Sequence, residues 1–144
     1  MIIKFLFYLG LIAMTATTDA REPSKKLPMC PTSPNCVSSQ AGDADHYIAP
    51  FKIIGKPEEA WAALKQALGS QSRTVITEAT DGALHAEATS LVFRFVDDID
   101  AILDADAKLI HIRSASRVGY SDLGVNRKRI ENLRKQMQQA GIIE

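Results

Sequence analysis

Four β-rich runs follow one another with no helix between them, and this order constrains the fold more than any other feature of the chain. The runs span residues 73–79, 83–89, 91–103 and 108–116. Thr80-Asp81-Gly82 joins the first two, and Asp-Gly between β-rich runs is a strong hairpin signal. Strands linked by such short turns pair antiparallel, because a parallel connection needs about a dozen residues or more. The sequence therefore predicts an antiparallel sheet.

Two segments with helical periodicity flank these runs. The first opens at Lys56-Pro57-Glu58-Glu59, with a proline in the first turn and carboxylates at the positive end of the helix dipole. Its apolar stripe consists of Trp61, Leu64 and Leu68. The second spans residues 123–140, with a stripe of Leu123, Ile130, Leu133 and Met137. We expect the two helices to cover one face of the sheet.

A further strand is predicted at residues 47–54, before the first helix. The fold class is then α+β, in the order β-α-β-β-β-β-α, with an antiparallel sheet of about five strands and two helices on one face. This order is that of TATA-binding-protein-like domains, an analogy that carries no functional weight. We expect Phe93 and Phe95 to join Trp61 in the core of a single α+β domain over residues 46–144.

Residues 1–20 have the sequence pattern of a signal peptide. Lys4 precedes an uncharged stretch over residues 5–16, and Thr18-Asp19-Ala20 offers small residues at the positions that a signal peptidase reads. A helix over that stretch rises only about 18 Å, which is short of a bilayer core of roughly 30 Å. A periplasmic or secreted protein is predicted, with no transmembrane segment in the mature chain.

The segment 21–45 is rich in Pro, Ser, Asp and Gly and is expected to be an extended arm. It contains the two cysteines, Cys30 and Cys36, in C-P-T-S-P-N-C. Two close cysteines in an oxidising compartment normally pair. Zinc would need two more ligands, and His46 is the nearby candidate. We therefore expect a disulfide, no metal and no cofactor.

Arginine, serine and glycine crowd the junction between the last predicted strand and the last helix, R-S-A-S-R-V-G-Y-S-D-L-G-V-N-R-K-R over residues 113–129. Ser121 or Asp122 is placed to cap that helix. Guanidinium groups and free N–H groups at a helix start suit an anion pocket. The candidate ligand-binding residues are Arg113, Ser114, Ser116, Arg117, Tyr120, Asn126, Arg127, Asp97, Asp98, Ser38 and Ser39.

The same residues can instead form an internal network. Asp97 and Asp98 lie on the neighbouring predicted strand, within reach of Arg113 or Arg117. Asn126 shares the apolar stripe of the last helix, so its amide needs partners inside the protein. Lysine and arginine together number 17, as do aspartate and glutamate. Net charge therefore gives no reason to expect nucleic acid or an anionic membrane as the partner.

Three segments resemble the signature segments of the DUF1499 family, a domain of unknown function. They are C-P-T-S-P-N-C-V-S-S-Q over residues 30–40, F-R-F-V-D-D over 93–98 and the run from Arg113 to Ile130. The resemblance extends over roughly residues 28–141 and implies no established reaction, substrate or cofactor. It does indicate that the three segments belong to one unit. We expect the P-N-C-V-S-S loop over residues 34–39 to fold against the arginine–serine strand.

Three hypotheses for function follow. The first is a small binding or accessory module of the cell envelope that holds an anionic small molecule, a glycan or an envelope protein. The second is a hydrolase-like enzyme using Asp97 or Asp98 as acid or base beside the arginines; a carboxylate with a raised pKa in a deep pocket would favour it. The third is a structural subunit of an envelope complex, which predicts an exposed apolar patch. Whether the protein is an enzyme stays open, and no catalytic residue is assigned.

Overall fold

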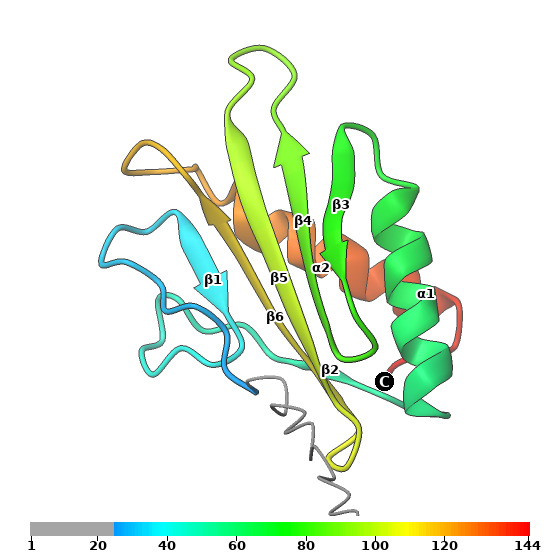
Figure 1. The fold of residues 1–144 in the computed structure, drawn as a ribbon. Helices are drawn as coiled ribbons and strands as arrows, with labels where there is room; N and C mark the ends of the chain where they lie inside the picture. The colour runs from blue at the N-terminus through cyan, green and yellow to red at the C-terminus, as the bar shows by residue number, and fades with distance from the viewer. Residues whose placement is uncertain (1–24) are drawn as a thin grey trace, which may run out of the picture.

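The computed structural model describes residues 25–144, and the predicted signal peptide lies outside them (Figure 1). The elements in chain order are β1 (Cys36–Ser38), β2 (Phe51–Lys52), α1 (Pro57–Gly69), β3 (Thr74–Ala79), β4 (Ala83–Thr89), β5 (Val96–Asp104), β6 (Leu109–Ser116) and α2 (Val125–Gln139). The α+β class is confirmed. Within residues 25–144, no helix is long and apolar enough to cross a bilayer.

The sheet is antiparallel, with the strand order β1-β6-β5-β4-β3 (Figure 1). Strand β2 also pairs with β6, near Ile110, whereas β1 pairs with β6 near Ala115. The sheet therefore has six strands where the sequence pattern predicted about five. The strand that the pattern missed is β1, because three residues in a proline-rich segment show no alternation. The likeness to TATA-binding-protein-like domains stays a prediction.

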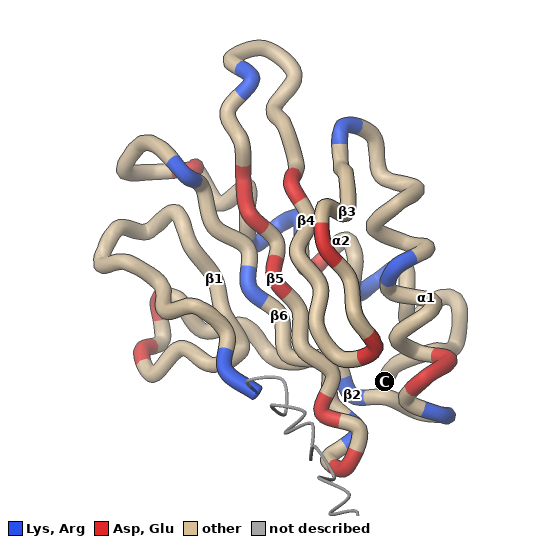
Figure 2. The backbone as a smooth tube through the Cα atoms, in the orientation of Figure 1, with Lys and Arg blue, Asp and Glu red and all other residues tan. Residues whose placement is uncertain are grey.

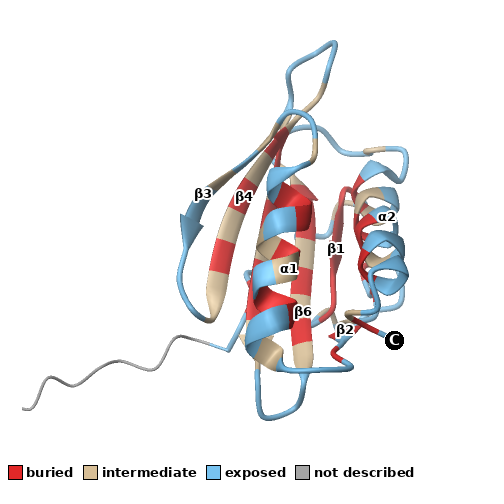
Figure 3. Ribbon diagram, turned by 90° about the vertical axis from the view of Figure 1, so that its right-hand side faces the viewer, coloured by how far each residue is buried: buried red, intermediate tan, exposed pale blue. Residues whose placement is uncertain are grey.

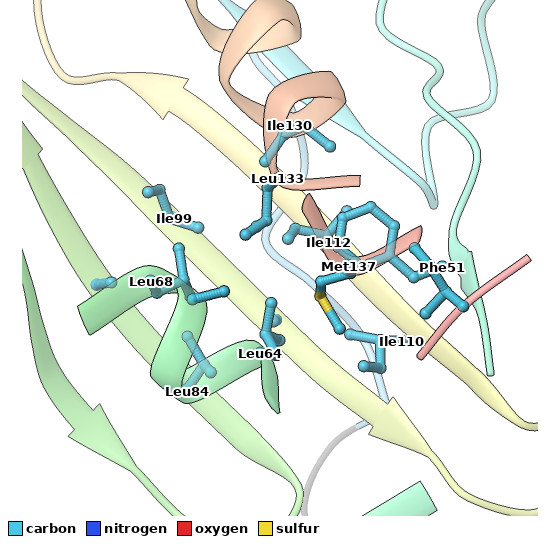
Figure 4. Close-up of a cluster of buried hydrophobic side chains, with 14 of the residues drawn as sticks. Phe51, Leu64, Leu68, Leu84, Ile99, Ile110, Ile112, Ile130, Leu133 and Met137 are labelled. Atoms are coloured by element: carbon cyan, nitrogen blue, oxygen red, sulfur yellow. The ribbon is translucent and has the colours of Figure 1, made fainter. Parts of the chain in front are cut away.

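Both helices lie on one face of the sheet, as expected (Figure 3). Side chains alternate across a strand, so every second residue of the central strands is buried under the helices. The helices contribute most of the predicted stripes: Trp61, Leu64 and Leu68 are buried in α1, and Ile130, Leu133 and Met137 are buried in α2. Leu123 was expected in the second stripe, but it precedes α2 and is exposed, so this part of the prediction was wrong. Figure 4 shows the central cluster, which includes Ile99, Ile112, Leu133 and Met137. Each such aliphatic side chain contributes roughly 1.5–3 kcal/mol on burial.

The predicted strand over residues 91–103 is only partly correct, because β5 begins at Val96. Arg94 has φ 53°, in the left-handed region, and this turns the chain out of the sheet. The Ser90 hydroxyl accepts a hydrogen bond from the Phe95 N–H and closes the loop. Phe93 and Phe95 are consequently 74% and 51% exposed, stacked on each other at 5.5 Å. The expectation that they belong to the core was wrong, since an apolar run does not reveal where a strand begins.

The predicted strand over residues 47–54 shrinks to Phe51–Lys52. Pro50 has no N–H to donate to a ladder, so regular pairing begins only after it. Tyr47 and Ile53 each form a single isolated bridge, to Ser38 and Ile143. The segment therefore connects the sheet to α1 with only two residues in regular strand pairing.

The two ends of the sheet differ. Three connections meet at one end, which we call the loop end: residues 70–73, 90–95 and 117–124. The opposite end, the turn end, carries the tight turns 80–82 and 105–108. Helix α2 starts at the loop end, because it follows directly on residues 117–124. The loop end is therefore where a helix N-terminus and three irregular segments come together (Figure 1).

Candidate functional site

The candidate residues divide between the two faces of the sheet. Along β5 and β6, side chains alternate, so Asp97 and Ser114 point toward the helices. Asp98 and Arg113 point toward the face without helices, where Arg117 joins them. The structure therefore does not bring the candidate residues together in one pocket. It forms two separate clusters, one on each face.

Asn126 is the centre of the cluster on the helix face. It is fully buried, as is Ser114, whose hydroxyl donates a 2.7 Å hydrogen bond to Asn126 Oδ1. The Asn126 amide group donates to Ser116 Oγ at 2.9 Å and to the carbonyl of Asn35 at 3.2 Å. The prediction that Asn126 faces inward and needs partners is confirmed. The network fastens α2 to β6 and to the loop before β1.

Asp122 holds the start of α2, but from before the N-cap position, which is Gly124 and not Ser121 or Asp122 as the sequence pattern predicted. Its carboxylate accepts hydrogen bonds from the backbone N–H groups of Gly124 and Asn126, both at 2.9 Å. Burial raises the pKa of Asp122, but these hydrogen bonds outweigh that effect and leave the pKa below its ordinary value. Gly119 and Gly124 have φ 84° and 78°, in the left-handed region. Glycine adopts this backbone conformation without strain, so both positions of the turn before the helix suit it.

Arg129 links this network to Asp97. Its guanidinium donates to Asn126 Oδ1 at 2.8 Å and to Ser114 Oγ at 3.0 Å. It also forms an ion pair with Asp97, with 2.6 Å between Nη2 and Oδ2. Both side chains are largely buried, which strengthens the pair and holds the guanidinium in one place.

A cleft of about 500 Å³ lies above the Asp97–Arg129 pair. Its walls are the α1–β3 connection, the end of β4 and the first half of α2. Among its lining residues are Arg73, Ser90, Asp97, Lys128, Arg129 and Asn132. Three cationic side chains and one carboxylate face this cleft, so it carries an excess of positive charge. Of the candidate residues named from the sequence, Asp97 is the one that lines it.

The second cluster lies on the helix-free face and is a network of ion pairs. Arg117 bonds to Asp98 through both Nε and Nη2 and also contacts Glu87. Arg113 pairs with Asp100 at 3.0 Å. The hydrogen bonds from Arg117 lower the pKa of Asp98, so this carboxyl stays ionised at neutral pH. Arg113, Arg117 and Asp98 therefore belong to an internal network of ion pairs, the alternative to an anion pocket that the sequence left open.

The same face holds the one group within residues 25–144 whose ligand atoms are close enough to share a metal ion. His85, Glu87 and Asp98 each offer an atom, all within 4.8 Å of one another. The guanidinium of Arg117, however, already bonds both Glu87 and Asp98. A cation would have to displace it, and we assign no metal site there.

The N-terminal loop folds against the arginine–serine strand, as expected. Strand β1 pairs with β6, with Cys36 opposite Ala115 and Ser38 opposite Arg113. Ser39 Oγ accepts a hydrogen bond from the Ile112 N–H at 2.9 Å. Ser38 and Ser39 are both buried, and the Ser38 hydroxyl accepts a hydrogen bond from the Gln40 N–H. Ser38 also lines a separate cleft between residues 25–30 and 40–43.

Cys30 and Cys36 form the predicted disulfide, with Cα atoms 5.7 Å apart. His46, the histidine considered as a zinc ligand, bonds instead to Asp43 Oδ1 at 2.7 Å and to the carbonyl of Ser33 at 2.9 Å. The hydrogen bond to Ser33 raises the pKa of His46, and burial only partly opposes this.

Two other candidate residues face outward or bind the backbone. Arg127 donates to the carbonyls of Tyr47 and Asp45, both at 2.9 Å, and so ties α2 to the segment before β2. Tyr120 is 73% exposed on the connection 117–124. Neither residue lines the cleft.

The residues that make the cleft cationic were not singled out from the sequence. Arg129 lies three residues after Asn126, and this helical spacing could have placed it beside the buried amide. Arg73 and Lys128 gave no comparable signal. Arg73 lies in the α1–β3 connection and Lys128 in the first turn of α2, and they meet only because β3 and α2 begin at the same end of the fold.

The three segments that resemble the DUF1499 signatures are neighbours in space. Residues 30–40 contain β1, residues 113–130 contain the second half of β6, and residues 93–98 contain the start of β5. These three strands are adjacent in the sheet. Residues 26–137 match a family model described as "Protein of unknown function (DUF1499)". No curated protein and no solved structure matches the chain.

Proposed function

The chain belongs to the DUF1499 family, and we propose that it is a small binding module that holds an anionic molecule in the cleft above Asp97 and Arg129. The observation that carries the proposal is the surplus of cations in this cleft. The ligand class is a small molecule bearing phosphate or carboxylate groups. An accessory role in the cell envelope is part of the same proposal.

The arrangement of charges supports an anion. Arg129 neutralises Asp97 at the base, with 2.6 Å between the charged groups. Arg73 and Lys128 then face the cleft without a second lining carboxylate. Arg73 Nε donates to the carbonyl of Thr89 at 3.1 Å, which holds this side chain beside the cleft. A guanidinium and an ammonium directed at one opening suit an oxyanion, which can accept from both.

The size and the other lining groups also support a small ligand. Pockets for small molecules typically measure about 300–1,000 Å³, and the cleft of about 500 Å³ lies within that range. Ser72, Thr74, Ser90 and Asn132 add hydroxyl and amide donors around the cations. Such neutral donors can bind the remaining oxygens of a phosphate or a carboxylate.

The proposal that the protein is exported is supported by two features. The first is the signal-peptide pattern of residues 1–20. The second is the Cys30–Cys36 disulfide, since disulfides persist in oxidising compartments such as the periplasm. We therefore place the binding module in the periplasm or outside the cell.

The hydrolase hypothesis receives less support from the carboxylates. A general acid needs a raised pKa, but Arg117 lowers the pKa of Asp98. Asp97 is held in an ion pair by Arg129.

The structural-subunit hypothesis predicts an exposed apolar patch, and apolar side chains are exposed at the loop end.

The test is calorimetric titration of the purified protein with inorganic phosphate and with pyrophosphate. Arg73→Gln and Lys128→Gln each remove one charge from the cleft without touching the core. Each should weaken binding roughly tenfold, because a charge-assisted hydrogen bond contributes about 1.5–3 kcal/mol. Lys135→Gln is the matched control, since Lys135 is exposed on the same helix but does not line the cleft. Equal binding by all four proteins, or no heat of binding, would refute the proposal.

A further inference from the structure

Two connections at the loop end expose apolar side chains. The first connects β4 to β5, where Leu91, Val92 and Phe93 are 70%, 76% and 74% exposed. The second connects β6 to α2, where Tyr120 and Leu123 are 73% and 94% exposed. Large apolar side chains that gather on one exposed surface commonly mark an interaction site. We call these five residues the apolar tip.

The two connections leave the sheet next to each other. Asp97 of β5 pairs with Ser116 of β6, and these residues stand at the start and the end of their strands. The Arg117 N–H then donates to the carbonyl of Val96 at 3.1 Å, directly below both connections. The two loops of the apolar tip therefore leave the same end of the sheet from neighbouring strands; in Figure 1 the β4–β5 connection projects at the top of the view and the β6–α2 connection at the upper left.

Three cations without a carboxylate partner lie at the loop end, the same end of the fold as the apolar tip. Within residues 25–144, Arg73, Arg94 and Lys128 form no ion pair, and all three are exposed. Arg94 lies between Phe93 and Phe95 in the first loop. In Figure 2 the tips of the connections after α1 and after β4 are blue.

The carboxylates near this end are already engaged. Asp97 pairs with Arg129, Asp98 with Arg117, and Asp122 accepts the first N–H groups of α2. The loop end thus presents apolar side chains together with unpaired positive charge. The balanced net charge of the whole chain conceals this local surplus.

We propose that the loop end docks on an anionic lipid surface. Aromatic and aliphatic side chains on a loop enter the headgroup region, where rings are favoured, and cations beside them bind lipid phosphates. Phe93 and Leu123 provide the inserting groups, and Arg94 and Lys128 provide the charge. A protein partner with an apolar surface would not require the surrounding cations.

The inference does not depend on the anion cleft. No residue of the apolar tip lines that cleft. Arg73 and Lys128, two of the three unpaired cations at the loop end, do line it. Docking would bring the opening of the cleft close to the lipid surface, because both lie at the loop end.

Vesicle binding tests the docking directly. The protein should sediment with phosphatidylcholine vesicles that contain phosphatidylglycerol and only weakly with pure phosphatidylcholine vesicles. Phe93→Ser and Leu123→Ser should each weaken the binding roughly tenfold. Ile54→Ser is the matched control, since Ile54 is 56% exposed but follows β2 at the turn end. All three variants should bind inorganic phosphate like the wild-type protein, which separates docking from the cleft.

A fluorescent label locates the contact. Both cysteines are bonded to each other, so one new thiol can be labelled specifically. An environment-sensitive dye on Phe93→Cys should shift to the blue and become protected from a soluble quencher when anionic vesicles are added. The same dye on Ala105→Cys, in the turn-end connection, should not change.

Three outcomes would overturn the proposal. They are a failure to bind anionic vesicles, binding that is equally strong in the Phe93→Ser and Leu123→Ser variants, and a label at position 93 that stays in water. If Phe93→Ser instead abolished self-association of the protein in the absence of lipid, the apolar tip would be an interface between two copies.

Discussion

Ser114 Oγ donates a 2.7 Å hydrogen bond to Asn126 Oδ1 at a place where neither residue is exposed to solvent. This contact joins β6 to α2. The same amide oxygen accepts a hydrogen bond from Arg129, which lies at the base of the cleft. The network that fixes α2 on the sheet therefore also fixes the deepest cation of the cleft.

Replacing Asn126 with alanine should destabilise the protein by about 3 kcal/mol, because several buried polar groups lose their partner. The groups that each lose one hydrogen bond belong to Ser114, Ser116 and Arg129. Chemical denaturation measures the free energy of unfolding. Gln136→Ala, an exposed amide on the same helix, should change it by less than about 0.5 kcal/mol. A small effect of Asn126→Ala would show that the hydrogen-bond network contributes little to the free energy of unfolding.

A double-mutant cycle isolates the contact itself. Ser114→Ala and Asn126→Ala should be non-additive by about 1 kcal/mol, as is usual for residues in one hydrogen-bond network. The measurement is the free energy of unfolding of the two single variants and the double variant. Additive effects would mean that the two side chains act independently.

Arg117→Glu discriminates between the two interpretations of the helix-free face. The change places a third carboxylate beside Glu87 and Asp98, so it should lower the melting temperature and raise the pKa of Asp98. NMR titration of the Asp98 carboxyl measures the second effect. Phosphate binding should be unchanged, since Arg117 does not line the cleft. Loss of phosphate binding with normal stability would instead make Arg117 a ligand-binding residue.

His46 should make stability depend on pH near neutrality. Its pKa is raised above 6.5 in the folded protein, chiefly by the hydrogen bond to the Ser33 carbonyl. Its contribution is therefore fully present below pH 6.5 and is lost as the pH rises through the folded pKa. The free energy of unfolding of the wild-type protein and of His46→Gln should be measured from below pH 6.5 to above the folded pKa of His46. The difference between the two proteins in this free energy should shrink with increasing pH. A difference that grew with pH would contradict the hydrogen-bond assignment.

Phe93 and Trp61 should respond very differently to truncation. Trp61→Ala should cost about 3–5 kcal/mol, as expected for a buried aromatic residue. Phe93→Ala should change the free energy of unfolding by less than about 0.5 kcal/mol, because the ring is 74% exposed. A large loss at Phe93 would indicate that the 90–95 connection packs against the rest of the protein.

Much of the fold follows from local patterns in the sequence. The Asp81-Gly82 hairpin, the proline at the start of α1 and its apolar stripe lie where their patterns predicted, and so do Ile130, Leu133 and Met137 of α2. Leu123 was wrongly placed in that second stripe, because it precedes α2 and is 94% exposed. Local patterns failed where a distant segment decides the structure. Strand β1 exists because Val37 meets Ser114, and no signal within residues 36–38 reveals that pairing.

The candidate site was harder to predict for the same reason. The arginine–serine pattern correctly identified a dense polar network, but a strand sends alternate residues to opposite faces. Arg113 and Ser114 therefore entered different clusters. The cleft joins Arg73 to Lys128 across separate elements, so its cationic character becomes visible only once the sheet and α2 are assembled.

The most direct test of the anion cleft is an NMR titration with inorganic phosphate that follows the backbone amides and the arginine Nε–H groups. We predict saturable shifts at Arg73, Ser90, Lys128 and Arg129, and none at Arg113 or Arg117. The shifts at Arg73 should be smaller in Lys128→Gln at the same sub-saturating phosphate concentration, because this change weakens binding roughly tenfold. If phosphate shifted no resonance of the cleft, or shifted only residues of the helix-free face, the cleft would not be the binding site.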